Sequence, residues 1–142
     1  MDKFTHLGAA VADLEAAWRD RLKDAEILLK AKRSGAAIAD GIYALEIRLK
    51  VLVCKRLDLS ALPRVFEIHD LDALLLLAGL KNRMEAADVE QDHWNAIKDL
   101  ARQLQQLRYT ENKKWALTLA RTFWHQLTDP TEGVMTWLSK QK

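Results

Sequence analysis

Apolar residues recur at intervals of three and four along most of the chain, which is the spacing of one face of an α-helix. A first helix is predicted from about Gly8 to Arg33, with a stripe of Val11, Leu14, Trp18, Leu22, Ala25 and Leu29. A second is predicted from about Ala36 to Arg56, with a seam of Ile38, Ile42, Leu45, Leu49 and Leu52. No segment alternates apolar and polar residues over a useful length, so we expect an all-α protein.

Turn-forming residues divide the remaining pattern. Ser34 and Gly35 mark a short turn, and Pro63 lies in the longest predicted loop. A short third helix is predicted over residues 70–78, with Asp70 as its N-cap and Gly79 as its C-terminal cap. Further helices are predicted over about 85–109, 112–127 and 131–142. We expect one domain over residues 1–142, in which the short connections favour antiparallel neighbours. Its architecture should be an antiparallel up-and-down bundle of four to five core helices plus a short C-terminal helix.

The second helix carries polar residues on the face opposite its apolar seam. Tyr43, Glu46, Lys50 and Cys54 share this face, and Glu46 and Lys50 have the favourable i,i+4 order for an ion pair. One interpretation is an internal pair that fixes the position of the helix. The other is a polar pocket or a symmetric contact between subunits.

Composition sets limits on compartment and partners. The 142 residues include 22 basic and 20 acidic side chains, a net charge of +2 that neither demands nor excludes nucleic acid. A single cysteine, Cys54, excludes an internal disulfide and a cysteine-based zinc cluster, and it fits a reducing compartment. The N-terminal segment lacks the layout of a signal peptide, and the apolar run at 73–78 is too short to cross a bilayer. We therefore expect a cytoplasmic protein without a membrane partner.

Four segments in order resemble the HEPN domain family. Residues 35–57 are similar to its second-helix signature, which is matched at Gly35, Tyr43, Ala44, Glu46, Leu49 and Lys50. This chain departs from the pattern by one residue, because Ile42 separates the glycine from the tyrosine. Residues 69–80 resemble the His-Asp-Leu segment and the short third helix. Residues 107–109 resemble the Arg-Tyr element, and 134–138 resemble the tryptophan-containing end of the domain.

The resemblance implies an all-α bundle that is usually a homodimer and is often found beside a small nucleotidyltransferase. One branch of the family cleaves RNA as a toxin or defence protein. It uses an arginine and a histidine with four to six residues between them, without a metal: the histidine moves the 2′-hydroxyl proton and the arginine stabilises the phosphate charge. Another branch lacks this motif and binds a substrate or a partner.

The nuclease motif has no good match at the expected place. Arg64 and His69 have the required spacing, but Arg64 lies in a predicted loop and His69 aligns with the His-Asp-Leu segment. Arg121 and His125 lie on a late helix, with only three residues between them. The best match to the family arginine is Arg108, which no histidine follows at the family's spacing. The resemblance therefore implies a non-catalytic module.

The expected function is binding of a nucleotide-like or nucleic-acid ligand, or partnership with a small nucleotidyltransferase. The expected binding residues, taken from the resemblance and from chemical plausibility, are Tyr43, Glu46, Lys50, His69, Arg108 and Tyr109. Lys50 and Arg108 would contact phosphate, Tyr43 or Tyr109 would stack on a base, and His69 would orient the second and third helices. The alternatives are a metal-independent ribonuclease and a purely structural dimer.

No cofactor and no metal site is expected from the sequence. The nearest acidic–histidine group is Glu90, Asp92 and His93, which lies in a charged helical stretch with poor ligand spacing. We therefore expect a solvated surface there.

Overall fold

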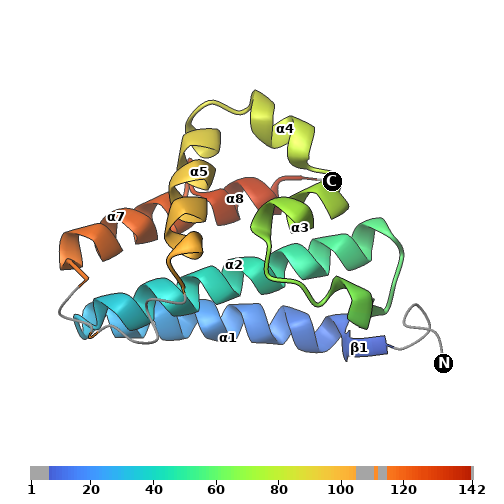
Figure 1. Ribbon diagram of the computed structural model, residues 1–142, viewed down its shortest axis with the longest axis horizontal. Coiled ribbons are helices and arrows are strands. Elements are labelled where there is room, and N and C mark those ends of the chain that lie inside the picture. Colours follow the sequence, from blue (N-terminus) through green and yellow to red (C-terminus); the bar gives the residue numbers. More distant parts are fainter. Residues whose placement is uncertain (1–6, 105–110, 112–114, 142) are drawn as a thin grey trace.

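Two long helices, α1 (Val11–Lys30) and α2 (Ser34–Arg56), run antiparallel along one side of the protein in the computed structural model (Figure 1). The structure describes residues 7–104, 111 and 115–141. The remaining helices are α3 (Leu71–Leu77), α4 (Lys81–Ala86), α5 (Val89–Arg102), α7 (Leu117–Thr128) and α8 (Val134–Ser139). In Figure 1, α5 stands steeply across the direction of α2. The predicted all-α class is confirmed, and no helix in the described ranges combines the length and apolar character needed to cross a bilayer.

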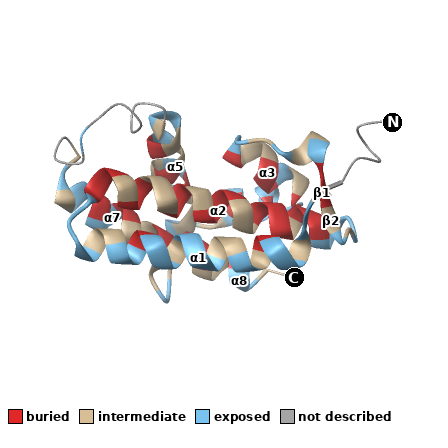
Figure 2. Cartoon of the chain, turned by 90° about the horizontal axis from the view of Figure 1, so that it is seen from below, coloured by how far each residue is buried: buried red, intermediate tan, exposed pale blue. Residues whose placement is uncertain are grey.

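Helix α2 is the centre of the fold, because α1, α3, α5 and α7 all pack against it. Figure 2 shows buried residues along most of α2, whereas α1 carries exposed residues along much of its length. The main core joins the predicted seam of α2 to side chains from the later helices, among them Leu74, Trp94, Ile97, Phe123 and Leu138. A smaller cluster on the other side of α2 holds Leu14, Val51, Cys54 and Leu62.

A glycine lets α7 approach α2 closely. A Cβ atom at Gly41 would lie 2.6 Å from Phe123 Cε2, which is too short for any side chain to occupy without moving the ring. Phe123 itself is buried in the main core. Cores are packed at crystal-like density. The aromatic ring of Phe123 therefore fills the space that a side chain at position 41 would otherwise occupy.

Three helices end in the same way, with one residue at positive φ. At the end of α3 that residue is Gly79 (φ 76°): its N–H donates to the Leu76 carbonyl, and the next N–H donates to Leu75. This is the Schellman arrangement, and it confirms the predicted cap. Lys32 (φ 61°) and Asp58 (φ 55°) hold the equivalent positions after α1 and α2. The turn after α1 is therefore made by Lys32, and Ser34 and Gly35, which were predicted to form it, are instead buried residues at the start of α2.

Helix α3 begins at the predicted cap. The side chain of Asp70 accepts a hydrogen bond of 3.1 Å from the Ala73 N–H. The leucines of α3 differ in burial: Leu71, Leu74 and Leu75 are buried, but Leu76 is 56% exposed.

Several predicted boundaries differ from the structure. The segment after α2, predicted as a loop, contains a short strand β2 (Ala61–Pro63) and a 3₁₀ turn η1 (Arg64–Phe66). Strand β2 pairs antiparallel with β1 (Leu7–Ala10), which was predicted as the beginning of the first helix. The predicted helix over 85–109 is divided, because Ala87 adopts an extended backbone between α4 and α5. The C-terminal end predicted for this helix lies outside the described residues.

Candidate functional site

Three of the six predicted binding residues lie together beside the start of α3. Glu46 and Lys50 are one turn apart on α2, and the Lys50 Nζ atom lies 3.1 Å from the Glu46 Oε2 atom. The Nδ1 atom of His69 lies 3.0 Å and 3.1 Å from the two carboxylate oxygens of Glu46. The carboxylate of Glu46 thus links α2 to the segment that leads into α3.

The burial of this group is uneven. The side chains of Glu46 and Lys50 are 8% and 10% exposed, whereas the His69 side chain is 83% exposed. Two opposite charges in contact are therefore withdrawn from water, and each satisfies the other. The predicted ion pair and its burial are confirmed. Contact of Lys50 with phosphate, or of this face with a second subunit, stays a prediction.

Of the other three predicted residues, one lies in the described part of the chain. Tyr43 lies on α2 one turn before Glu46 and is half-buried. Arg108 and Tyr109 lie outside the described residues.

A pocket of about 330 Å³ opens next to His69, between the start of α3 and the last turns of α5. Its lining residues are His69, Asp70, Leu71, Asp72, Lys98, Ala101 and Arg102. Its two long cationic side chains already have acidic partners: Lys98 lies 3.0 Å from Asp72, and Arg102 lies 2.7 Å from Asp99. Positive and negative charges are balanced here, which does not favour an anionic ligand.

Asp72 is the best-connected carboxylate of this first pocket. Burial acts to raise its pKa, but hydrogen bonds from Lys98 and from the Trp94 indole, together with the positive charges of Lys98 and Lys81, outweigh burial, and the pKa lies below the ordinary value of 3.8. Asp72 therefore joins α3 to α5 as a charged group.

A second pocket, of about 340 Å³, lies where the ends of α2 and α3 meet the start of α4. It combines three cationic side chains with apolar surface, and no carboxylate is among its described lining residues: Leu52, Lys55, Arg56, Ala78, Gly79, Leu80, Arg83 and Gln141. We call this the basic pocket. The sequence did not predict this pocket. Positive side chains such as Lys55 and Arg56 are common in the last turn of any helix, and nothing in the sequence indicates that Arg83 lies near them.

Arg56 is held in the basic pocket by the end of α3. Its Nη1 atom donates to the carbonyl oxygens of Leu77, at 3.0 Å, and Leu76, at 3.4 Å. A Cβ atom at Gly79 would lie 2.7 Å from Arg56 Nε, so a side chain there would displace the guanidinium from this position. The residue that caps α3 therefore also makes the space that Arg56 occupies.

The histidines considered for RNA cleavage have carboxylates beside them. Arg64 opens the turn η1 and is exposed, while His69 lies against Glu46. Arg121 and His125 lie one turn apart on α7, and His125 Nε2 lies 3.6 Å from Glu132 Oε1. We expected Glu90, Asp92 and His93 to form a solvated surface group, but the position of His93 differs from that expectation. That imidazole is half-buried and lies edge-on to His125, with ring centroids 5.9 Å apart.

Comparisons with protein-family models, with curated proteins and with solved structures find no match to this chain.

Proposed function

We propose that this protein is a non-catalytic, HEPN-type module that binds a phosphate-bearing, nucleotide-like ligand in the basic pocket. The observation that carries the proposal is the grouping of Lys55, Arg56 and Arg83 around one cavity that has no carboxylate among its described lining residues. Arginine and lysine are the side chains that recognise phosphate oxygens. The apolar residues Leu52, Ala78 and Leu80 supply a surface for the less polar part of such a ligand.

The contacts of the cations support an anion-binding role. The Nη1 atom of Arg56 donates to neutral carbonyl oxygens, so this interaction does not cancel the positive charge of the guanidinium. Lys55 lies 3.1 Å from Glu15 Oε1. The Lys55 side chain is 56% exposed and the Glu15 side chain 25% exposed, and pairs near the surface are weak enough to exchange partners. A phosphate group entering the pocket would therefore meet the guanidinium of Arg56 and would compete with Glu15 for Lys55.

The resemblance supports the class of ligand and the absence of catalysis. The branch of the family that binds a substrate or a partner lacks the nuclease pair, and Arg108 here has no histidine at the family's spacing. The same resemblance implies a small nucleotidyltransferase as a partner, and this partnership is part of the proposal. The phosphate contact is placed at the basic pocket because Lys50 is already paired and is only 10% exposed.

The test is a fluorescence titration of the purified protein with a fluorescently labelled ADP at low salt. Arg83→Gln and Arg56→Gln should each weaken binding about tenfold, which corresponds to the loss of one charge-assisted hydrogen bond. The matched control is Arg102→Gln, which removes the same charge from the first pocket and should leave binding unchanged. Binding should also weaken as salt rises. No binding by the parent protein, or equal losses in all three variants, would refute the basic pocket as the site.

A second assay separates this proposal from the nuclease. Single-stranded RNA incubated with the parent protein should remain intact, because removal of a general acid–base group typically costs about 10²–10⁴ in rate. Cleavage that is abolished by His69→Ala or by His125→Ala would overturn the non-catalytic assignment and identify the catalytic histidine.

A further inference from the structure

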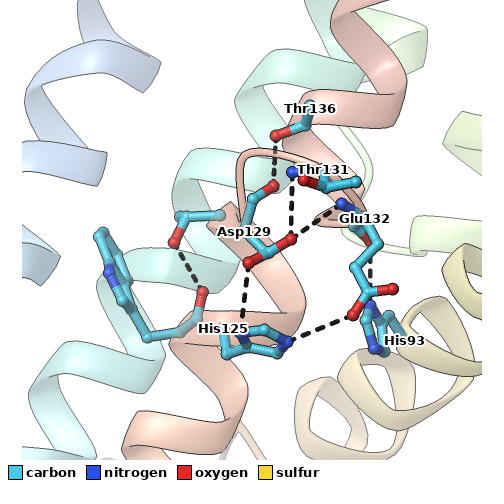
Figure 3. Close-up of polar contacts among 8 residues, drawn as sticks. His93, His125, Asp129, Thr131, Glu132 and Thr136 are labelled. Atoms are coloured by element: carbon cyan, nitrogen blue, oxygen red, sulfur yellow. Dashed lines mark hydrogen bonds and ion pairs between the residues drawn. The ribbon is translucent and has the colours of Figure 1, made fainter.

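A second group of side chains, outside both pockets, joins three parts of the chain. His93 comes from α5, His125 from α7, and Glu132 from the turn between α7 and α8 (Figure 3). Each offers one potential ligand atom, and these three atoms all lie within 4.8 Å of one another. Imidazole nitrogen and carboxylate oxygen together are a ligand set that proteins use for zinc and related ions.

The hydrogen bonds of His93 decide which of its nitrogens is available. Its Nδ1 atom lies 3.1 Å from the backbone carbonyl oxygen of Glu132. A carbonyl oxygen only accepts, so Nδ1 carries the proton and Nε2 keeps the lone pair of the neutral ring. An acceptor behind the ring is the usual way in which proteins orient a metal-binding histidine.

His125 also has a carboxylate next to its Nδ1 atom. Its Nδ1 atom lies 3.5 Å from Asp129 Oδ1, while its Nε2 atom faces Glu132 Oε1 at 3.6 Å. Figure 3 shows the ring between these two carboxylates. A carboxylate on one side of the imidazole and a potential ligand on the other is the order of groups seen in carboxylate–histidine–metal triads.

The turn that carries Glu132 is held by Asp129. The Oδ2 atom of Asp129 accepts the backbone N–H groups of Thr131 and Glu132, both at 3.0 Å. Its carbonyl oxygen accepts the Thr136 hydroxyl at 2.7 Å. At Gly133 a Cβ atom would press against the Asp129 backbone, so the turn closes this tightly only with glycine there. Glu132 therefore projects from a braced turn, which reduces the ordering that a bound ion would have to impose.

We propose that His93, His125 and Glu132 bind one divalent transition-metal ion of the zinc class, with a fourth coordination position open to solvent. Ligand atoms about 2.0–2.1 Å from a tetrahedral zinc lie about 3.3–3.4 Å from one another, close to the 3.6 Å between His125 Nε2 and Glu132 Oε1. Two neutral imidazoles, one carboxylate ligand and the Asp129 carboxylate behind them balance a charge of +2.

The exposure of the group fits an open site. The side chains of His125 and Glu132 are 54% and 40% exposed, which gives an ion a path from solvent. Three protein ligands leave one position for water or for an exogenous anion, which is the pattern of catalytic rather than structural zinc sites. The ion would also tie α5 to the end of α7, helices that already pack against each other.

The test is isothermal titration of the metal-free protein with zinc chloride, beside Co²⁺ titration followed by visible absorption. The parent should bind one Zn²⁺ per chain, and Co²⁺ should give the intense visible bands of a tetrahedral site. His125→Ala and Glu132→Gln should each weaken Zn²⁺ binding by more than tenfold and remove the cobalt bands. Asp129→Asn, which keeps an oxygen for the turn, should weaken binding about 10–100-fold, as the loss of an orienting group does.

The matched control is His69→Ala, which removes an exposed histidine that lies against Glu46. It should leave the Zn²⁺ affinity and the cobalt spectrum unchanged, and circular dichroism should show that all variants keep the helical content of the parent. Absence of binding by the parent, or binding that survives both His125→Ala and Glu132→Gln, would overturn the proposal. Because none of these residues lines the basic pocket, the outcome is independent of nucleotide binding.

Discussion

Replacement of Glu46 by alanine tests whether the buried pair on α2 stabilises the fold. The change leaves the Lys50 ammonium without its partner at 3.1 Å, on a side chain that is only 10% exposed. It also removes both carboxylate oxygens that face His69 Nδ1. Breaking a fully buried pair costs about 3–5 kcal/mol, because an uncompensated charge stays in the core. Some relief through the flexible lysine stem lowers the expected loss to about 1–4 kcal/mol.

The chain provides a matched control for this measurement. Glu26 and Lys30 form the same kind of i,i+4 pair on α1, at 3.5 Å, but their side chains are 50% and 76% exposed. Glu26→Ala should change the free energy of unfolding by less than about 0.5 kcal/mol, since exposed pairs of this type contribute little. Urea unfolding followed by tryptophan fluorescence measures both variants in the same way.

A double variant separates the missing charge from the missing volume. Glu46→Leu combined with Lys50→Met keeps the side chains large and removes both charges, and such replacements of buried pairs are often neutral or stabilising. We expect it to recover most of the stability lost in Glu46→Ala. A loss in Glu46→Ala no larger than that in Glu26→Ala would refute the reasoning, because the pair would then behave as a surface pair.

Three further outcomes are expected. Asp72→Asn should make the free energy of unfolding less dependent on pH in acid. The lowered pKa of Asp72 stabilises the folded protein above pH 3.8, the pKa of the unfolded state, and this stabilisation is lost as the pH falls through the lower pKa of the folded state. Urea titrations between about pH 2 and pH 5 measure the difference. Lys32→Gly should raise the free energy of unfolding by about 0.5–1 kcal/mol, because glycine tolerates the positive φ; thermal unfolding that shows a loss would contradict it. Sedimentation at micromolar concentration should give twice the 16.2 kDa chain mass, and Leu76→Asp should lower it if the exposed leucine lies in the interface.

Features that depend on neighbours in the sequence were predictable. The i,i+4 order of Glu46 and Lys50 indicated their contact, and the apolar seam of α2 indicated which side meets the core. Gly79 ended α3 as expected, because a glycine after an apolar run is the common signal for a positive φ. The equivalent ends at Lys32 and Asp58 were missed, since lysine and aspartate do not carry that signal although the backbone imposes the same geometry.

Features that join distant segments were not predictable from one sequence. The guanidinium of Arg48 lies 5.2 Å from the Trp18 ring centroid and its side chain is 12% exposed, because α1 covers that face. His93 was grouped with its sequence neighbours, whereas α5 and α7 cross so that it meets His125. Which helices become neighbours is decided by the whole packing, and no local spacing encodes it.

The central position of α2 has a consequence for how the protein opens. A helix on the surface can unfold locally by losing one packed side, but α2 is covered by α1, α3, α5 and α7, so its amides reach water only when several of these helices separate. Hydrogen exchange should therefore be slowest in α2, close to the rate set by global unfolding, and faster in α4. Any ligand or ion that holds the surrounding helices in place would then slow exchange in α2 without touching it.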